Sequence, residues 1–389
     1  MHPGHYTMNA TDLYLYAATL LQAQLRWRDY GPKCTATRLL GVLFYAAAQL
    51  CSVFAACSRL REAPSDQAVR NALVALCPEA RVLEQQFNRS FAQQLPKALR
   101  RRRNRLAIDL TLIPYHGQPH QRIEEIYRSQ AKSGTTHFHA YATCYVVHKG
   151  QRFTVALMRV ERGTTMVTVL KQLLRTARSA GVRPSLLLLD RGFYSVEVIR
   201  YLRAARYLFL MPVIGRGLKP SDPRGPSGTY AFVAQKRWGW ARYTLSNADG
   251  QTATVQIRIH CRNWQGRRGR HGRQPLVYAY WGLEPKTTHW VYQTYRPRFG
   301  IETSYRQLQQ ARIQTTARSP ALRLLFVGIA LLLRNIWVWA HWHRLATPRR
   351  GGRKLNLPRL RFKTLLMWLT HVAEQSFGFT DYVVTERLA

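Results

Sequence analysis

Acidic residues are scarce in this sequence, and the resulting charge imbalance is its strongest compositional feature. The 389 residues include 19 Asp and Glu against 59 Lys and Arg, which gives a formal net charge of +40 at pH 7. A field of this sign attracts phosphate backbones by releasing their condensed counterions. We therefore expect a polyanionic partner, with nucleic acid the leading candidate. Charge alone leaves a ribosomal partner or an anionic membrane surface as alternatives.

Cysteine pairs and a secretory leader are also missing. The six cysteines form no CxxC pair and no Cys/His cluster with zinc spacing, so neither a zinc ribbon nor a disulfide framework is indicated. The first residues show no basic segment followed by an apolar one, and no secretory signal is expected. These absences favour a protein of a reducing cytoplasm.

Long uncharged apolar runs are lacking as well. Only the segment Ala321–Trp342 suggests a membrane span, and Arg323, Arg334 and Asn335 interrupt it. The uncharged run that remains, Leu324–Leu333, has about half of the roughly 20 residues that a bilayer requires. We therefore predict a buried core helix and no membrane partner.

The pattern of apolar runs, prolines and basic clusters divides the chain into five regions. We predict a helical DNA-binding domain over 1–104, a catalytic core over 105–214 and 294–345, a β-rich insertion over 215–293, and a basic helical region over 346–389. Within the first region, Ser65 is a plausible N-cap of a helix that presents Gln67, Arg70 and Asn71. These side chains suit contacts in a DNA groove, although an ordinary solvated helix face explains them equally well.

The order of expected elements after residue 105 indicates the fold. Three strands are followed by a helix, a strand, a second helix and a strand, namely Leu106–Pro114, Phe138–Val147, Phe153–Val160, Thr165–Ala180, Ser185–Leu189, Ser195–Ala205 and Tyr207–Val213. This β-β-β-α-β-α-β order is typical of an α/β fold with a mixed sheet of the ribonuclease-H-like kind. Further strands are expected in the insertion, among them Thr229–Val233 and His289–Tyr292.

Two of the few carboxylates lie in apolar strands. Asp109 interrupts the run Leu106–Ile113, where a charge costs several kcal/mol unless it is paired or bound to a cation. Asp190 follows the four leucines Leu186–Leu189, at the carboxyl end of a strand, where α/β sheets usually bind their ligands. A structural ion pair for Asp109 and a helix cap for Asp190 are the alternatives.

A third carboxylate lies in a segment that begins at Tyr295. Pro297 suits the first turn of a helix, and at about 100° per residue several side chains then share one face. These side chains are Arg298, Glu302 and Gln309, with Arg306 beside them. A plain ion pair between neighbouring turns is the simpler explanation of Glu302.

These residues resemble the motifs of DDE transposases. The spacing Tyr295-x2-Arg298-x3-Glu302 is similar to the start of the Y-x2-R-x3-E-x6-K signature of the insertion-sequence superfamily numbered four. Asp109 in Ala-Ile-Asp-Leu-Thr and Asp190 in Leu-Asp-Arg-Gly-Phe resemble the first and second acidic motifs of that group. The resemblance covers about 105–320 in the right order.

One position departs from the signature. Gln309 stands where the family has its final Lys, which removes a charge that binds phosphate but keeps a hydrogen-bonding side chain. Arg306 or Arg312 is the expected substitute.

The resemblance implies a DNA transposase that cleaves and transfers strands of an insertion sequence by cut and paste. It implies that Asp109, Asp190 and Glu302 are the catalytic residues and the ligands of two Mg²⁺ or Mn²⁺ ions. The chain would act on transposon ends and target DNA as a homodimer, in the cytoplasm of a bacterial or archaeal cell and close to the nucleoid. The DNA contacts expected from the resemblance and the charge pattern are Tyr295, Arg298, Arg306, Gln309, Lys132, Arg191, Arg101, Arg102 and Arg103.

Three other interpretations stay open at this point. The chain could be a catalytically idle, DNA-binding relic of a transposase, or a ribonuclease-H-like nuclease that cuts without joining strands. A metal site made of histidines near Asp109 is also conceivable, from His116, His120, His137 and His139. Hard carboxylate ligands nevertheless suit Mg²⁺ better than imidazole does.

Overall fold

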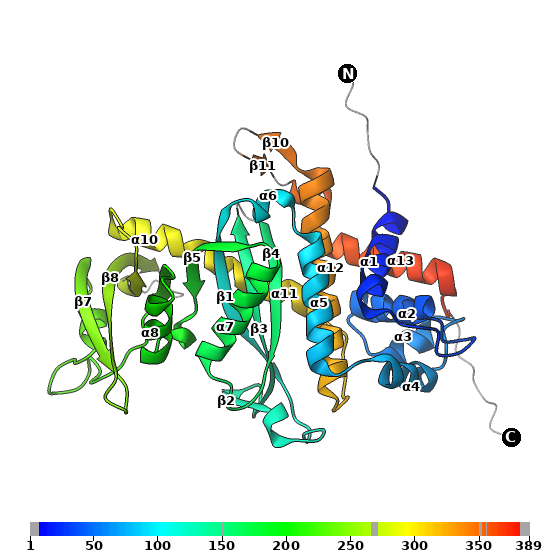
Figure 1. The fold of residues 1–389 in the computed structure, drawn as a ribbon, viewed down its shortest axis with the longest axis horizontal. Coiled ribbons are helices and arrows are strands. Elements are labelled where there is room, and N and C mark those ends of the chain that lie inside the picture. The colour runs from blue at the N-terminus through cyan, green and yellow to red at the C-terminus, as the bar shows by residue number, and fades with distance from the viewer. Residues whose placement is uncertain (1–7, 149–150, 266–270, 350–351, 355, 382–389) are drawn as a thin grey trace.

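The chain forms an elongated molecule with a helical bundle at one end, a sheet in the middle and a three-stranded extension of that sheet at the other end (Figure 1). The computed structural model describes residues 8–148, 151–265, 271–349, 352–354 and 356–381. The catalytic core expected from the sequence lies between the bundle and the extension, but the division into five regions stays a prediction.

The bundle combines the first helices of the chain with the last one. It contains α1 (Ala10–Leu25), α2 (Ala36–Ala48), α3 (Val53–Arg59), α4 (Asp66–Leu76), α5 (Ala80–Gln94), the short α6 (Lys97–Arg100) and α13 (Phe362–Phe377). The predicted N-cap at Ser65 is confirmed, because its side chain accepts a hydrogen bond from the backbone N–H of Ala68. All six cysteines are unpaired, and four of them, Cys34, Cys51, Cys144 and Cys261, are buried.

The central sheet has the strand order expected for a ribonuclease-H-like core. Its strands are β1 (Arg103–Pro114), β2 (Tyr127–Lys132), β3 (Thr135–His148), β4 (Gln151–Val160), β5 (Arg183–Leu189), β6 (Phe209–Pro212), β7 (Gly239–Ser246), β8 (Thr252–Gln265) and β9 (His271–Trp281). The core order is β4-β3-β1-β5-β6, in which β3 runs antiparallel to β1 and β4 while β5 and β6 run parallel to β1. Helices α7 (Met166–Ser179) and α8 (Val196–Ala204) connect the parallel strands (Figure 1).

The β-rich insertion continues this sheet. β9 pairs with β6, and β8 and β7 follow outward, so the core and the insertion share one hydrogen-bonded sheet. Two of the strands expected here are wrong, because Thr229–Val233 lies at the short helix α9 (Tyr230–Ala234) and His289–Tyr292 lies inside α10 (Thr288–Tyr295).

Local hydrogen bonds explain both corrections. The Thr287 side chain accepts from the Trp290 N–H and caps α10, whose buried residues recur with helical spacing. The Thr229 hydroxyl donates to the Ile214 carbonyl and accepts from the Arg216 N–H, which folds that segment back instead of extending it. Apolar and β-branched composition alone could not reveal either contact.

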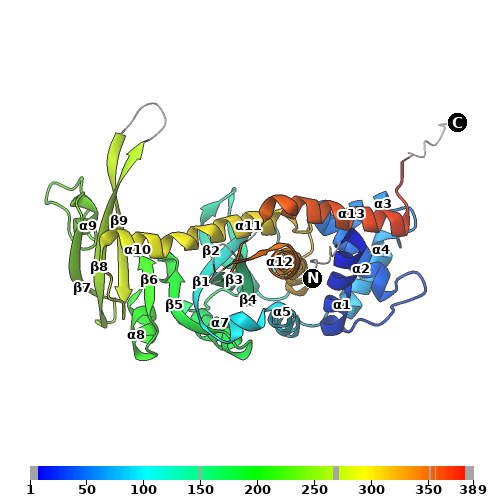
Figure 2. The ribbon, with the colours of Figure 1, turned by 90° about the horizontal axis from the view of Figure 1, so that it is seen from above.

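Pro297 lies in the first turn of a helical element, as predicted, but this element is a 3-10 turn that continues α10. α10 leads through a 3-10 turn, η4 (Arg296–Phe299), directly into α11 (Gly300–Gln310), and the three follow one another across the strands (Figure 2). Pro297 has no N–H to donate, so the α-helical hydrogen bonding is interrupted at this position and the chain tightens locally.

The apolar segment near the end of the core forms α12 (Pro320–Ala340). With the short helical turn that follows it, this helix is long and apolar enough to cross a membrane, but 89% of its apolar window is buried inside the protein. It packs against α5, β4 and α11. The prediction of a buried core helix is confirmed.

β4 pairs with β3 on one side, as the described strands are arranged, and lies at the edge of the sheet. On its other side, polar side chains from α5 and α12 make hydrogen bonds to its backbone. Asn335 accepts from the Thr154 N–H at 2.9 Å and donates to the Thr154 carbonyl at 2.8 Å. Asn88 makes the same pair of bonds with Leu157, at 2.7 and 2.9 Å. A further bond runs from Arg334 to the Arg152 carbonyl. Two of the polar residues that interrupt the apolar run of α12, Arg334 and Asn335, therefore protect a sheet edge that would otherwise be open.

The remaining elements are short. They are the turns η1 (Ile123–Glu125), η2 (Arg191–Phe193), η5 (His341–Leu345) and η6 (Leu357–Arg359), and a hairpin of β10 (Thr347–Arg349) and β11 (Gly352–Lys354).

Candidate active site

Asp109, within β1, and Asp190, directly after β5, lie side by side on neighbouring parallel strands. Ile108 of β1 pairs with Leu189 of β5, so the residues that follow them are the two carboxylates. Asp109 is buried, with 9% of its surface exposed, whereas the Asp190 side chain is 40% exposed. The two neighbouring strands thus place one buried and one accessible carboxylate side by side.

Arg298 bridges the two carboxylates. Its Nη2 atom lies 3.1 Å from Asp109 Oδ1 and 3.2 Å from Asp190 Oδ1, and its side chain is only 6% exposed. Burial lowers the pKa of the Arg298 guanidinium, but the neighbouring Tyr295, Asp109 and Asp190 groups raise this pKa above its ordinary value overall. One guanidinium therefore stays charged between the two carboxyl groups.

Tyr295 fastens the helical segment to the end of β5. Its side chain is fully buried, and its hydroxyl donates to the Leu189 carbonyl at 2.9 Å, directly before Asp190. Burial raises the pKa of the Tyr295 hydroxyl, which keeps this group protonated as a donor. The Arg298 guanidinium carbon lies 5.9 Å from the Tyr295 ring centre.

A second tyrosine fastens α11 to the strand beside Asp109. Thr143 of β3 is the register partner of Asp109, and its hydroxyl lies 2.8 Å from the hydroxyl of Tyr305 on α11. Burial and the nearby Asp109 charge raise the pKa of Tyr305 well above its ordinary value. This contact holds α11 against β3, the strand that pairs with β1 at Asp109.

Glu302 lies on α11 one turn before Tyr305, and its side chain is outside the described residues. In the described part of the chain, no group of three or more His, Cys, Asp or Glu residues is placed to hold a metal ion. The structure thus brings together two of the three predicted carboxylates and places the third on the adjoining helix.

A comparison with protein-family models identifies the same region of the chain. The model described as "Transposase DDE domain" matches residues 100–336, which is more than half of the sequence and includes Asp109, Asp190 and Glu302. The chain belongs to the DDE transposase family. Its general function is therefore DNA transposition, and its enzyme class is nucleotidyl transfer. Assignment to superfamily four stays a prediction.

Two further comparisons add little to this assignment. No curated protein sequence matches the chain. A cryo-EM structure of a piggyBac transposase synaptic complex with hairpin DNA aligns with 97% of this chain and 74% of its own chain, at 13% identity and a TM-score of 0.48.

A buried arginine orients α11, the helix that carries Glu302. Arg334 of α12 is 2% exposed, and its guanidinium donates to the Ser304 hydroxyl at 2.8 Å and to the Gln307 side-chain carbonyl at 3.3 Å. Burial lowers the pKa of Arg334 to about 10, so the group remains protonated at neutral pH. α11 is thus held by Arg334 on one side and by the contact between Tyr305 and Thr143 on another.

The expected DNA contacts fall into four groups. Arg191 directly follows Asp190, and Arg306 and Gln309 are exposed on α11. Lys132 is exposed in the β2–β3 hairpin, beyond the carboxyl end of β1. The exposed run Arg101–Arg103 instead lies at the amino end of β1, away from the carboxylates. Tyr295 and Arg298 are buried, and their contacts are with the strand end and the carboxylates.

The histidines near Asp109 do not form a metal-binding group among the described residues. His139 is 2% exposed, and burial together with the charges of Arg323 and Arg159 lowers its pKa to about 3. Its ring lies edge-on to Tyr115, at 4.6 Å between ring centres.

Sequence reasoning missed three functional neighbours: Thr143, Tyr305 and Arg334. The only local signal was the position of Tyr305 one helical turn after Glu302. Thr143 and Arg334 are far away in sequence from the residues that they contact, and only the strand register and the helix packing bring them together.

Proposed function

We propose that this transposase cleaves DNA at the site formed by Asp109 and Asp190, and joins the freed 3′ ends to a target by cut and paste. The observation that supports this proposal is the pair of carboxylates at neighbouring positions of two parallel strands, bridged by one guanidinium and with one accessible member.

The donor set fits divalent metal ions. Carboxylate oxygens are the ligands that Mg²⁺ and Mn²⁺ prefer, and two of them lie within hydrogen-bond distance of the same Arg298 nitrogen. Asp109, Asp190 and Glu302 would hold two such ions. The chemistry that bound ions supply at such a site is activation of the attacking water or 3′-hydroxyl and stabilisation of the leaving oxygen.

The residues around the carboxylates have positioning roles in this proposal. Arg298 holds Asp109 and Asp190 at a fixed spacing, and Tyr295 fixes the strand end from which Asp190 projects. Tyr305 holds α11, and with it Glu302, against β3. Arg191, Arg306, Gln309 and Lys132 contact the DNA backbone around the scissile phosphate.

Two duplex ends must be processed together for cut-and-paste transposition, so we propose that the chain acts as a homodimer on transposon ends and target DNA. The cytoplasm of a bacterial or archaeal cell, next to the nucleoid, is the proposed location.

The test is Mg²⁺-dependent cleavage and strand transfer on DNA that carries the ends flanking the gene of this protein. Wild type should yield cleaved and joined products, whereas Asp190→Asn and Asp109→Asn should yield neither and still bind the DNA. Asp249→Asn is the matched control, because this exposed carboxylate lies in a loop of the insertion.

The outcomes separate the proposal from its alternatives. Cleavage without any joined product would indicate a nuclease. Binding without metal-dependent cleavage, in wild type as in the variants, would indicate a DNA-binding relic, which the replacement of Lys by Gln309 also favours.

A further inference from the structure

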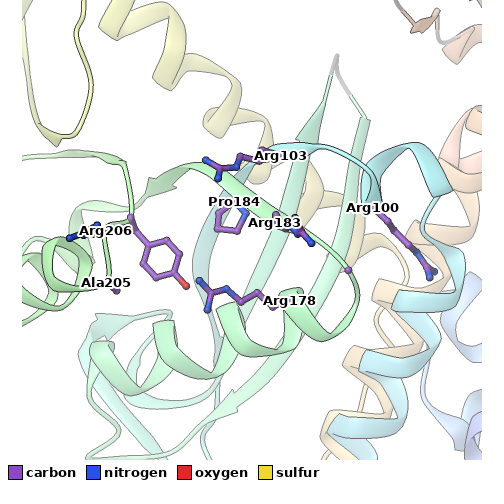
Figure 3. A pocket seen from close by; sticks show the side chains of 9 residues that line it. Arg100, Arg103, Arg178, Arg183, Pro184, Ala205 and Arg206 are labelled. Carbon is purple, nitrogen blue, oxygen red and sulfur yellow. The ribbon is translucent and has the colours of Figure 1, made fainter.

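Two of the cavities among the described residues are lined by arginines, and they differ in size. The larger one, of about 620 Å³, opens where β1 and β5 begin, and Arg103, Arg178 and Arg183 line it (Figure 3). It adjoins the expected DNA contacts Arg101–Arg103 and has room for several phosphate groups, so a DNA backbone accounts for it. The smaller one, of about 10 Å³, lies between the central sheet and α12, and the proposed function does not use it.

The smaller cavity lies on the face of the sheet that carries Asp109. Ile113 is four residues after Asp109 on β1, and its register partner on β3 is His139. Residues two or four positions apart on a strand share a face, so Ile113, His139 and Tyr141, which all line the cavity, lie on the same face as Asp109. At about 3.4 Å per residue, Ile113 is about 13 Å from Asp109. The cavity is therefore near the carboxylates without belonging to their site.

Buried polar groups without partners indicate a ligand in this cavity. The Tyr141 side chain is fully buried, and its hydroxyl has no hydrogen-bond partner among the described residues. His139 is 2% exposed, and both of its ring nitrogens also lack a partner there. Buried polar groups are almost always hydrogen-bonded. A small polar ligand in the cavity would provide the partners that the surrounding residues do not.

Two arginines give the cavity a positive charge. Arg312, which follows α11, is partly buried, and Arg323 of α12 is buried. The Arg323 guanidinium donates to the carbonyls of Ala317 and Thr315, which are neutral acceptors. None of the ion pairs among the described residues includes either arginine. The residues that line the cavity include no Asp or Glu, so its positive charge is not compensated.

The protonation states of the lining residues favour donors over acceptors. Burial raises the pKa of Tyr141 to about 12, against the opposing charges of Arg159, Arg323 and Arg312, so the hydroxyl stays protonated. Burial lowers the pKa of His139 to about 3, so its ring is neutral at pH 7 and has one N–H to donate. The guanidinium of Arg312 adds only donors.

An anion fits these groups better than a water molecule does. Water carries no net charge and must donate as well as accept, whereas an anion accepts from every donor around it and compensates the guanidinium charges. The volume limits the ligand to about the size of one water molecule. Chloride is only slightly larger than water, whereas a tetrahedral oxyanion such as phosphate is much larger.

We propose that this cavity binds a chloride ion. Tyr141 and His139 donate to the ion from β3, and Arg312 donates to it from the segment that follows α11. The ion thus connects that segment to β3, as the bond between the hydroxyls of Tyr305 and Thr143 connects α11 to the same strand. Bound chloride therefore fixes the end of α11 on the sheet.

The first test compares chloride with gluconate, an anion that is too large for the cavity. The Tm of the full-length protein is measured at constant sodium concentration while chloride replaces gluconate. The variants are Tyr141→Phe, which removes one donor, and Arg312→Gln, which removes one charge. The matched controls are Tyr194→Phe, which removes another buried hydroxyl without a described partner, and Arg318→Gln, which removes an exposed charge nearby.

The expected result is a stabilisation that depends on the cavity. Chloride at about ten times its Kd should raise the Tm of wild type and of both controls by about 2 to 4 °C. The rise should fall by at least half in Tyr141→Phe and be lost in Arg312→Gln. An equal rise in all of these proteins would overturn the proposal, because chloride would then act on the whole surface. An equal rise with phosphate in place of chloride would also overturn it, because the ligand would be an oxyanion such as a DNA phosphate.

The second test needs no substitution. Crystals of the wild-type protein are grown in sodium bromide and measured at the bromine absorption edge, where bromide gives an anomalous signal and water gives none. An anomalous peak within hydrogen-bond distance of the Tyr141 hydroxyl and the Arg312 guanidinium supports the proposal. Density without an anomalous peak would show a water molecule, and the absence of density would show no ligand; either result overturns the proposal. Neither test involves DNA, so their outcomes are independent of the proposed function.

Discussion

Asn335→Ala should be among the most destabilising single substitutions in this transposase. The Asn335 side chain is completely buried, and it satisfies both the N–H and the carbonyl of Thr154 on the edge strand β4. Removing the amide leaves both backbone groups without partners in a place that water does not reach. The strand edge then has two unsatisfied polar groups.

The size of the effect follows from these two groups. A buried backbone group without a partner costs about 1 to 3 kcal/mol, so the loss should be about 2 to 6 kcal/mol. Asn335→Leu fills most of the space but restores neither bond, so it should be nearly as destabilising as Asn335→Ala. Asn88→Ala should cost less, because Asn88 is only partly buried and water can replace its bonds to Leu157.

The assay is urea-induced unfolding followed by far-ultraviolet circular dichroism, with the free energy of unfolding compared between variants. Gln85→Ala is the control, since Gln85 is exposed on α5 and has no such role. If Asn335→Ala and Asn335→Leu both unfold within about 0.5 kcal/mol of wild type, as ordinary surface substitutions do, the hydrogen-bonded edge is not what stabilises this region.

Three other substitutions test the buried polar groups near the core and the site. Burial raises the pKa of Glu84 from its ordinary value of 4.5 to about 7 in the folded protein. The protonated side chain therefore contributes fully to the free energy of unfolding below pH 4.5, and this contribution of about 3 kcal/mol should be lost as the pH rises through 7. Glu84→Gln should abolish this difference between unfolding at pH 5 and at pH 8, and an unchanged pH dependence would assign it elsewhere. Arg298→Met leaves two carboxylates without their shared cation, so millimolar Mg²⁺ should raise the Tm of this variant more than that of wild type, whereas equal shifts would argue against metal binding there. Tyr305→Phe removes the bond to Thr143 and should cost about 1 kcal/mol of stability. It should also slow cleavage without changing the Kd for DNA, and a weaker Kd would instead indicate a direct DNA contact.

The positions of Asp109 and Asp190 could be predicted from the sequence because their signals are local. A charge inside an apolar strand and a charge at the end of a leucine run each identify a position in a sheet, and the order of strands and helices makes those strands neighbours. Family resemblance and physical pattern indicated the same two residues, Asp109 and Asp190.

The role of Arg298 could not be predicted in the same way. The sequence does not show how the segment from Tyr295 to Arg298 packs against β1 and β5, and this packing places the Arg298 guanidinium between Asp109 and Asp190. The helices at Tyr230–Ala234 and Thr288–Tyr295 were missed for a related reason, because side-chain hydrogen bonds decided their conformation over strand-like composition.

Adjacent residues of α12 connect the stability of the sheet to the geometry of the site. Asn335 satisfies the edge of β4, while its neighbour Arg334 holds α11 through Ser304 and Gln307. Both side chains are buried, so a shift of α12 that breaks one set of bonds must also strain the other. Arg334 and Asn335 thus weaken α12 as a membrane span, and through the same two side chains α12 holds both β4 and α11 in place. Substitutions elsewhere on the buried face of α12 should consequently affect catalysis by displacing α11, even though they touch neither DNA nor metal.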